Sequence, residues 1–322
     1  MLLFLIQLLF MDLMCYFGES CQKIHLIVQE TEVIIVNGID KDTYLNICRE
    51  AVEYAIISIP FTYNRMGVRG LKRKISNIAK GKLAEALFFY FCESNQISIN
   101  RAIGETPFYM PDKADFVFGN AEWDIKNNFI YHKGNYLFKK YYKWLPALIP
   151  DKSSRDQWSK RNQTTISKSF DKKYLFTFLK ASDSMDDRKQ LIDINLSENQ
   201  EKFLNELYQK FKNNRRPKEL PLEESAFWNQ FYKGANRAVL FKLQAFPQLI
   251  ITGYASAVHW HHFKDSGESR IWNNGLMRTV INNSYSRIHK LPSFASLVPA
   301  LKNKMELAHF SHPKGRANPY LL

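Results

Sequence analysis

The feature that most constrains the fold is a long helical segment followed directly by three short strand-like segments. Apolar residues recur at helical spacing over residues 71–93 and give this segment one face to bury. They are Leu71, Ile75, Ile78, Leu83, Leu87 and Tyr90. Strand-like runs follow at residues 97–103, 114–119 and 121–127, joined by brief polar turns. A helix packed on a β-meander is therefore expected, which indicates an α/β fold.

Segments on the N-terminal side of this unit predict one hairpin and one further helix. Residues 25–38 contain two β-rich runs around a polar centre, which is typical of two paired strands. Asp42 or Thr43 can cap a helix that Pro60 is expected to end. We expect residues 1–69 to form an N-terminal extension that packs on the core.

The C-terminal part of the chain predicts two strong strands separated by helices. The elements expected here are strands at residues 172–181 and 248–256 and helices at 198–212 and 223–243. Both helices fall between the two strands. We therefore expect one domain over residues 70–322, with a helical insertion at about 182–246.

The charge of the chain favours a polyanionic partner. Lysine and arginine outnumber aspartate and glutamate by 45 to 31, which gives a formal charge of +14. Hydrophobic residues make up 45% of the chain, which is enough for a substantial core and excludes global disorder. Folding does not require the charge excess, so nucleic acid is favoured over the alternative of a solvated basic face.

Neither the cysteines nor the first residues indicate an extracellular protein. None of the four cysteines forms a CxxC pair, so reduced thiols are expected rather than a disulfide scaffold or zinc finger. The first ten residues are apolar, but they lack the basic leader of a signal peptide and are too short to cross a bilayer. Met11 and Met14 offer alternative starts. A cytoplasmic location without membrane association is therefore expected.

Asp115, Asp124 and Lys126 are the strongest candidates for catalytic residues. Residues i and i+2 of a strand share a face, so Asp124 and Lys126 are expected to point the same way. A hairpin through residues 119–120 would bring Asp115 close to Asp124. Carboxylate oxygens suit Mg²⁺, and a lysine beside the ion can orient a water and counter phosphate charge. These residue types together fit hydrolysis of a phosphodiester bond.

A D-x-K triplet alone is a weak signal, and context selects one of three copies. They are Asp124–Lys126, Asp171–Lys173 and Asp187–Lys189. The first copy lies in an apolar strand-like run, with Asp115 on the strand before it. The second precedes its strand without a nearby acid, and the third lies in a polar run. The alternative for Asp124–Lys126 is an ordinary cross-strand ion pair on a surface strand.

Glu85 is a further candidate, because it lies on the apolar-rich half of the long helix. A carboxylate among apolar neighbours is costly unless it meets a cation or a metal ion. Its helical neighbours include Phe88, Phe89 and Cys92. The alternative is a solvated glutamate at the edge of the helix.

These residues together resemble the PD-(D/E)XK nuclease superfamily. A helix with an inward glutamate, followed by a meander that carries D…(D/E)xK, is the arrangement of this group of nucleases. The group includes type II restriction endonucleases, Holliday-junction resolvases and transposon nucleases. The resemblance covers about residues 70–127 and extends more weakly to a strand at 173–180. A literal Pro–Asp occurs at Pro111–Asp112, but strand phase favours Asp115, with Asp112 as the alternative acid.

The resemblance implies a fold, a cofactor and a role for each residue. It implies a restriction-endonuclease-like αβββαβ core, with a mixed central sheet flanked by helices. Asp115 and Asp124 would bind Mg²⁺, which Mn²⁺ is expected to replace. Lys126 would assist the attacking water, and Glu85 would support the site.

Two basic stretches after the candidate site are expected to contact nucleic acid. The first, KKYYKW at residues 139–144, interleaves cations with aromatic rings, which suits phosphate contacts and base stacking. The second, at residues 155–163, offers side chains that can read base edges. The candidate contacts are Lys139, Lys140, Lys143, Arg155, Lys160 and Arg161. A solvated basic face is the alternative for both stretches.

The histidines of HWHH at residues 259–262 also invite a metal interpretation. His259 and His261 would share one face of a strand. No cysteine or further histidine lies at zinc spacing, so a phosphate contact or a plain polar loop is favoured.

The function expected from the sequence is that of a metal-dependent endonuclease acting on DNA, such as a type II restriction or other defence nuclease. A homodimer is one arrangement that this class allows. The main alternative is a catalytically silent nucleic-acid-binding protein that keeps the fold as a scaffold. A third alternative is a structural or assembly protein with a basic surface, which predicts neither metal dependence nor DNA affinity.

Overall fold

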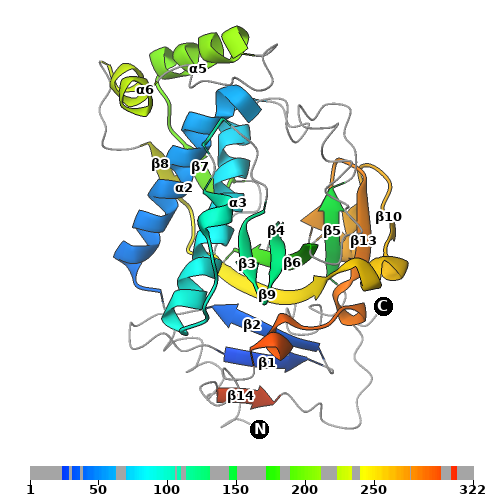
Figure 1. The fold of residues 1–322 in the computed structure, drawn as a ribbon. Coiled ribbons are helices and arrows are strands. Elements are labelled where there is room, and N and C mark those ends of the chain that lie inside the picture. The colour runs from blue at the N-terminus through cyan, green and yellow to red at the C-terminus, as the bar shows by residue number, and fades with distance from the viewer. Residues whose placement is uncertain are drawn as a thin grey trace, which may run out of the picture.

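A seven-stranded mixed β-sheet forms the centre of the described part of the chain (Figure 1). In this computed structural model the described residues are 24–28, 31–36, 39–62, 70–105, 107–109, 114–130, 145–150, 172–181, 189–211, 223–233, 240–275, 277–298 and 306–309. In spatial order the strands are β14 (Glu306–His309), β1 (Ile24–Val28), β2 (Thr31–Val36), β9 (Gln248–Ala255), β6 (Lys172–Lys180), β4 (Ala121–Ile130) and β3 (Phe116–Phe118). The pairs β1–β14 and β4–β6 are parallel, and the other neighbours are antiparallel.

Two long helices, α2 (Lys41–Thr62) and α3 (Leu71–Ser94), pack against each other beside one face of the sheet (Figure 1). The apolar stripe predicted for α3 is largely buried, including Leu71, Ile75 and Leu83. This stripe joins Val36 and Leu175 of the sheet in one hydrophobic core. The expected helix on a sheet is therefore confirmed.

A small unit lies between β6 and β9 in the chain. It contains a two-stranded ladder of β7 (Ile192–Ile194) and β8 (Phe241–Leu243) and two helices, α5 (Glu198–Phe211) and α6 (Glu224–Phe231). Ser76 of α3 donates a hydrogen bond to the carbonyl oxygen of Ile192 at 2.7 Å, and α5 packs on α2. These contacts attach the unit to the helical layer. The predicted insertion limits of 182–246 stay a prediction.

The other face of the sheet is covered by a second, smaller sheet. Its strands are β10 (Lys264–Asp265), β13 (Asn283–Arg287) and β5 (Pro146–Pro150). A two-stranded ladder of β11 (Ile271–Trp272) and β12 (Met277–Arg278) falls between β10 and β13 in the sequence. Strand β6 serves both layers: Leu175 and Leu179 face the helices, and Phe176 and Phe178 face the smaller sheet. A strand buried on both faces explains the nearly continuous apolar run of β6.

Several predicted elements are confirmed. The hairpin at 25–38 forms as β1 and β2, and the runs near 114–119, 121–127, 172–181 and 248–256 form β3, β4, β6 and β9. The helix predicted at 198–212 forms as α5. Strand β2 pairs with β9, so the segment expected as an N-terminal extension shares the main sheet. The boundary predicted at residue 70 stays a prediction.

Other local predictions were wrong. Residues 97–103 form no strand beyond a single bridge at Asn100, because the Asn100 side chain accepts a hydrogen bond from the Ala102 N–H at 2.9 Å and the chain turns. The helix expected over 223–243 ends at residue 231, and residues 241–243 pair with β7 instead. The cap of α2 is Asp40, whose carboxylate accepts the N–H of Thr43 at 2.9 Å.

The structure establishes a mixed α/β fold with a curled sheet flanked by helices. Between β4 and β6 the described residues contain β5 and no helix, so the complete αβββαβ core stays a prediction. None of the described helices combines the length and the apolar character needed to cross a membrane.

Candidate active site

The hairpin of β3 and β4 builds the first half of the site. Gly119 and Asn120 form its turn, both with φ of 57°, a left-handed conformation that glycine and asparagine adopt most readily. The register pairs Phe116 with Trp123, and their rings stack at 5.8 Å between centroids. The indole N–H of Trp123 also donates to the Phe118 carbonyl oxygen at 2.9 Å. The predicted hairpin through residues 119–120 is therefore confirmed and held by aromatic packing.

Asp115 lies where β3 diverges from β4. Its backbone N–H donates to the Trp123 carbonyl oxygen at 2.8 Å, and its carboxylate Oδ2 accepts the N–H of Ile125 at 2.5 Å. On this side of β4 the carboxylate thus accepts a backbone N–H that a neighbouring strand would otherwise bond. Gly104 packs on the backbone behind it, because a Cβ at Gly104 would lie 2.6 Å from the Asp115 carbonyl oxygen. These contacts fix Asp115 beside Asp124.

Asp124 and Lys126 share one face of β4, as predicted. Trp123 and Ile125 belong to the core under the helices, so the alternate residues point to the opposite face. The Asp124 side chain is only 11% exposed, and its Oδ2 lies 3.5 Å from the Lys126 ammonium. The Lys126 ammonium also lies 5.5 Å from the centre of the Tyr174 ring on β6. Both functional groups are therefore held by neighbours rather than free in solvent.

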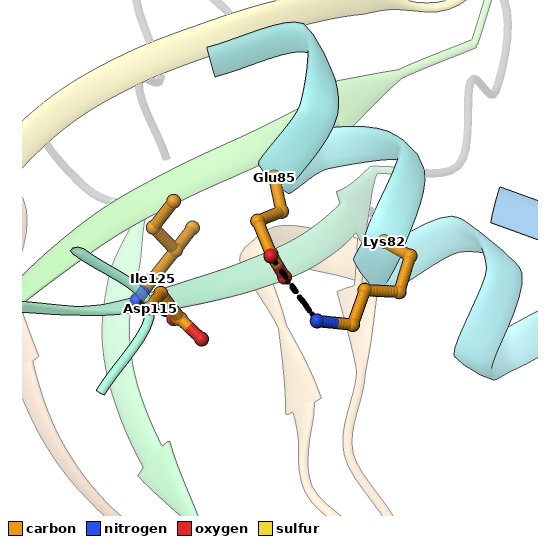
Figure 2. Close-up of polar contacts among 4 residues, drawn as sticks. All are labelled: Lys82, Glu85, Asp115 and Ile125. Carbon is orange, nitrogen blue, oxygen red and sulfur yellow. Dashed lines mark hydrogen bonds and ion pairs between the residues drawn. The ribbon is translucent and has the colours of Figure 1, made fainter. Parts of the chain in front are cut away.

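Glu85 approaches the same region from α3. Figure 2 shows its side chain reaching from the helix toward the strand that carries Ile125, with Asp115 beside it. Lys82, one turn earlier, forms an ion pair with Glu85 at 2.9 Å, and the Lys82 ammonium also lies 4.6 Å from the Tyr54 ring centre. The negative charge of Glu85 acts on Asp115, whose pKa it raises. The supporting role expected of Glu85 from the sequence stays a prediction.

The electrostatic environment of Asp115 is unusual for an aspartate. The pKa of its carboxyl is raised from 3.8 to about 7, chiefly by burial and further by the negative charges of Glu85 and Asp124. Lys126 and Lys82 act in the opposite direction. The charged form of Asp115 is therefore costly in the protein alone, and a bound cation would offset that cost. Such a raised carboxyl pKa is typical of functional sites.

The residues present fit a hard divalent cation. Mg²⁺ takes one or two carboxylates and keeps several waters, so it does not require a cage of protein ligands. Asp115 and Asp124 supply two carboxylates from adjacent positions of one hairpin. Within the described ranges, no three His, Cys, Asp or Glu side chains are grouped as a ready-made metal cluster. Two carboxylates are within the number of protein ligands that Mg²⁺ takes when it keeps its waters.

Lys172 belongs to the site and was missed in the sequence. Its ammonium lies 3.2 Å from Asp124 Oδ2, and its side chain is only 14% exposed. The parallel pairing of β4 with β6 places Lys172 opposite Glu122 and Tyr174 opposite Asp124, which puts Lys172 on the Asp124 face. Lys173 lies on the other face, 5.2 Å from the Trp123 ring centre. The DKK triplet was set aside because it had no partner acid nearby in sequence, yet β6 brings its middle residue to Asp124.

The histidines at 259–262 do not form a strand face. They belong to a 3₁₀ turn, η4 (Ala257–His262), in which His259 Nδ1 accepts the N–H of Ser256 at 3.0 Å. Burial lowers the pKa of His259, and His262 and His261 lower it further. The same turn carries Trp260, whose ring contacts Tyr174 at 5.7 Å between centroids. The turn therefore lies one aromatic ring from Lys126, and the phosphate contact or plain polar loop expected for its histidines stays a prediction.

The remaining candidates lie outside the described residues. They are Asp112, Lys139, Lys140, Lys143, Arg155, Lys160 and Arg161. Their roles stay predictions from the sequence. The structure therefore brings together Asp115, Asp124, Lys126 and Glu85 of the predicted set, and it adds Lys172.

Comparisons with known proteins leave the family open. No protein-family model, curated protein or solved structure matches the chain.

Proposed function

We propose that this chain is a divalent-metal-dependent endonuclease that hydrolyses DNA phosphodiester bonds. The observation that carries the proposal is the meeting of Asp115, Asp124 and Lys126 at one end of the β3–β4 hairpin. Glu85 adds a third carboxylate from α3, and its negative charge raises the pKa of Asp115. An ordinary cross-strand ion pair does not require a buried acid and a half-buried acid beside a third. The order of helix, hairpin and parallel strand also agrees with the resemblance noted in the sequence.

Each residue has a chemical task in this proposal. A bound Mg²⁺ would supply charge neutralisation at the phosphate and an activated water. Asp115 and Asp124 would hold it. The Ile125 N–H keeps the Asp115 carboxylate in place before substrate arrives, and the ammonium groups of Lys126 and Lys172 hold that of Asp124. Lys126 presents an ammonium beside Asp124, where it can orient the attacking water and offset charge on the phosphate. The formal charge of +14 provides the attraction to a polyanion.

A catalytically silent DNA-binding scaffold is the second candidate. Such a protein needs the basic surface but gains nothing from a carboxyl whose pKa is raised to about 7. The two candidates therefore differ in metal-dependent cleavage rather than in DNA affinity.

Cleavage of supercoiled plasmid DNA in Mg²⁺ and in EDTA tests the proposal. Asp124→Ala is expected to lower the Mg²⁺-dependent rate by at least about a hundredfold, since even outer-shell partners of metal sites contribute about 10–100-fold. Its DNA affinity, measured by gel shift, should stay nearly unchanged or rise. The reason is that the variant removes a negative charge and leaves the ammonium groups of Lys126 and Lys172 to the phosphate.

Lys126→Ala and Lys173→Ala complete the set. Lys126→Ala should also stop turnover and weaken DNA binding modestly, because it removes a cation from the site. Lys173→Ala is the matched control, since its ammonium lies over the Trp123 and Tyr254 rings on the other face of the sheet. It should keep most of the activity. Wild-type cleavage by Asp124→Ala would refute the assignment, and a wild type inert with both Mg²⁺ and Mn²⁺ would favour the scaffold.

A further inference from the structure

We infer that Lys172 is a positioning residue that makes binding of the divalent cation depend on binding of DNA. It holds the Asp124 carboxylate and competes for it with the cation. This inference rests on the proposed function and assigns the site a control that a simple pair of metal-binding acids would lack.

The contact geometry gives Lys172 a stronger hold on Asp124 than Lys126 has. The Lys172 ammonium lies 3.2 Å from Asp124 Oδ2, and the Lys126 ammonium lies 3.5 Å from the same oxygen. The Lys172 side chain is also less exposed, at 14% against 24%. Interactions between charges strengthen as water is excluded. Of the two lysines, Lys172 is therefore the principal counter-charge of the Asp124 carboxylate.

The position of Lys172 in the sheet keeps its ammonium there. Lys172 is the first residue of β6, and parallel pairing sets it directly opposite Glu122 of β4. Asp124 is the next residue of β4 on the same face, so it lies diagonally across from Lys172. Tyr174, two residues on, is fully buried in the core on the same face. The backbone of Lys172 is therefore fixed at the start of a central strand, and its side chain has little freedom to leave the site.

Competition between the lysine ammonium groups and the cation for the Asp124 carboxylate makes cation binding depend on DNA binding. A cation bound at Asp124 meets two ammonium groups close to the same carboxylate, which weakens its binding to the protein alone. A DNA phosphate adds negative charge beside both lysines and a further oxygen for the cation. DNA therefore relieves the repulsion, and by thermodynamic reciprocity the cation strengthens DNA binding by the same factor.

The test compares Lys172→Met with Lys173→Met, two neutral substitutions at adjacent positions on opposite faces of β6. Mn²⁺ binding to the DNA-free full-length chain is measured by electron paramagnetic resonance. We expect Lys172→Met to bind Mn²⁺ roughly tenfold more tightly than wild type, because one competing charge is removed. Lys173→Met should bind like wild type, since its ammonium lies over aromatic rings on the far face.

A second measurement reports the coupling itself. DNA affinity is compared in Ca²⁺ and in EDTA, and the ratio should fall in Lys172→Met but not in Lys173→Met. Lys172→Arg keeps the positive charge and should restore both wild-type values. Thermal unfolding checks that each variant is folded, and Lys172→Gln replaces Lys172→Met if that variant is not.

The possible results separate the inference from the function on which it rests. Equal Mn²⁺ affinities for wild type, Lys172→Met and Lys173→Met would overturn the inference while wild-type cleavage upholds the function. A wild type that neither binds Mn²⁺ nor cleaves DNA would overturn both.

Discussion

At Asp115 the chain places a carboxyl where its negative charge destabilises the folded protein. The backbone fixes the group at both its own N–H and its carboxylate, so it cannot turn away from Glu85 and Asp124. A side chain chosen for stability alone would carry no charge at this position. Functional sites commonly retain such destabilising groups because the reaction needs them. Asp115 should therefore show opposite effects in stability and activity when it is replaced.

Asp115→Asn should raise the free energy of unfolding at pH 8 in EDTA by about 1–4 kcal/mol, given a pKa raised from 3.8 to about 7. Between these two pKa values the folded wild type binds more protons than the unfolded chain, so its stability falls as the pH rises from about 4 to 7. The asparagine cannot ionise and still accepts the Ile125 N–H. Urea unfolding at pH 4 and pH 8 measures the difference, which should be small at pH 4.

Asp265→Asn is the control for this measurement, because Asp265 is exposed on β10. It should leave the pH dependence of stability as in wild type. The same Asp115→Asn protein should lose Mg²⁺-dependent cleavage. A variant that is no more stable than wild type at pH 8 would show that the Asp115 charge costs the fold nothing.

At the scale of elements, local signals in the sequence predicted the hairpin but not the strand beside it. The alternation in WDIK and the turn at Gly119 and Asn120 lie within a dozen residues. Asp124 and Lys126, which share one face of the strand, could therefore be found from the sequence. Lys172 enters the site through parallel pairing with a strand about fifty positions earlier, which no short pattern reveals. The strand predicted at residues 97–103 was wrong for a different reason. There the Asn100 side chain accepts the backbone N–H of Ala102, and a turn takes the place of the strand.

That turn has its own role, which Gly104→Ala tests. A Cβ at this position would lie 2.6 Å from the Asp115 carbonyl oxygen and 3.1 Å from that of Ala114. Backbone must move to admit it, so we expect a loss of about 1–3 kcal/mol in stability and a clear loss of cleavage. Gly81→Ala is the matched control, because a Cβ there meets nothing within 4 Å inside helix α3. It should gain up to about 1 kcal/mol and keep activity; equal behaviour of the two variants would show that Gly104 does not position Asp115.

At the scale of the whole molecule, the candidate site and the charge of the chain describe different parts of the function. The site is built from a few groups that are buried or half-buried, whereas the formal charge of +14 is spread over many residues. Charge spread over a surface predicts affinity for a polyanion without choosing a sequence or a reaction. The two contributions should therefore separate in experiments, with site variants changing cleavage and surface variants changing the salt dependence of binding.

Replacing Lys139, Lys140 and Lys143 together with alanine should weaken binding to every DNA sequence alike. If wild type neutralises roughly six phosphates, the logarithm of its affinity should fall with the logarithm of salt concentration with a slope of about −5. Loss of three phosphate contacts should reduce the slope to about −3. Fluorescence anisotropy over a salt series measures both slopes.

The control for charge alone is the triple variant Lys202→Ala, Lys210→Ala and Lys242→Ala. It removes the same number of positive charges from α5 and β8, in the unit that packs on the helical side of the sheet. Asp124 and Lys126 face the opposite side, so this variant should keep nearly the wild-type slope. Equal losses of slope in the two triple variants would mean that net charge, rather than a basic stretch next to the site in sequence, determines DNA binding. A wild-type affinity that does not change with salt would contradict binding through phosphates altogether.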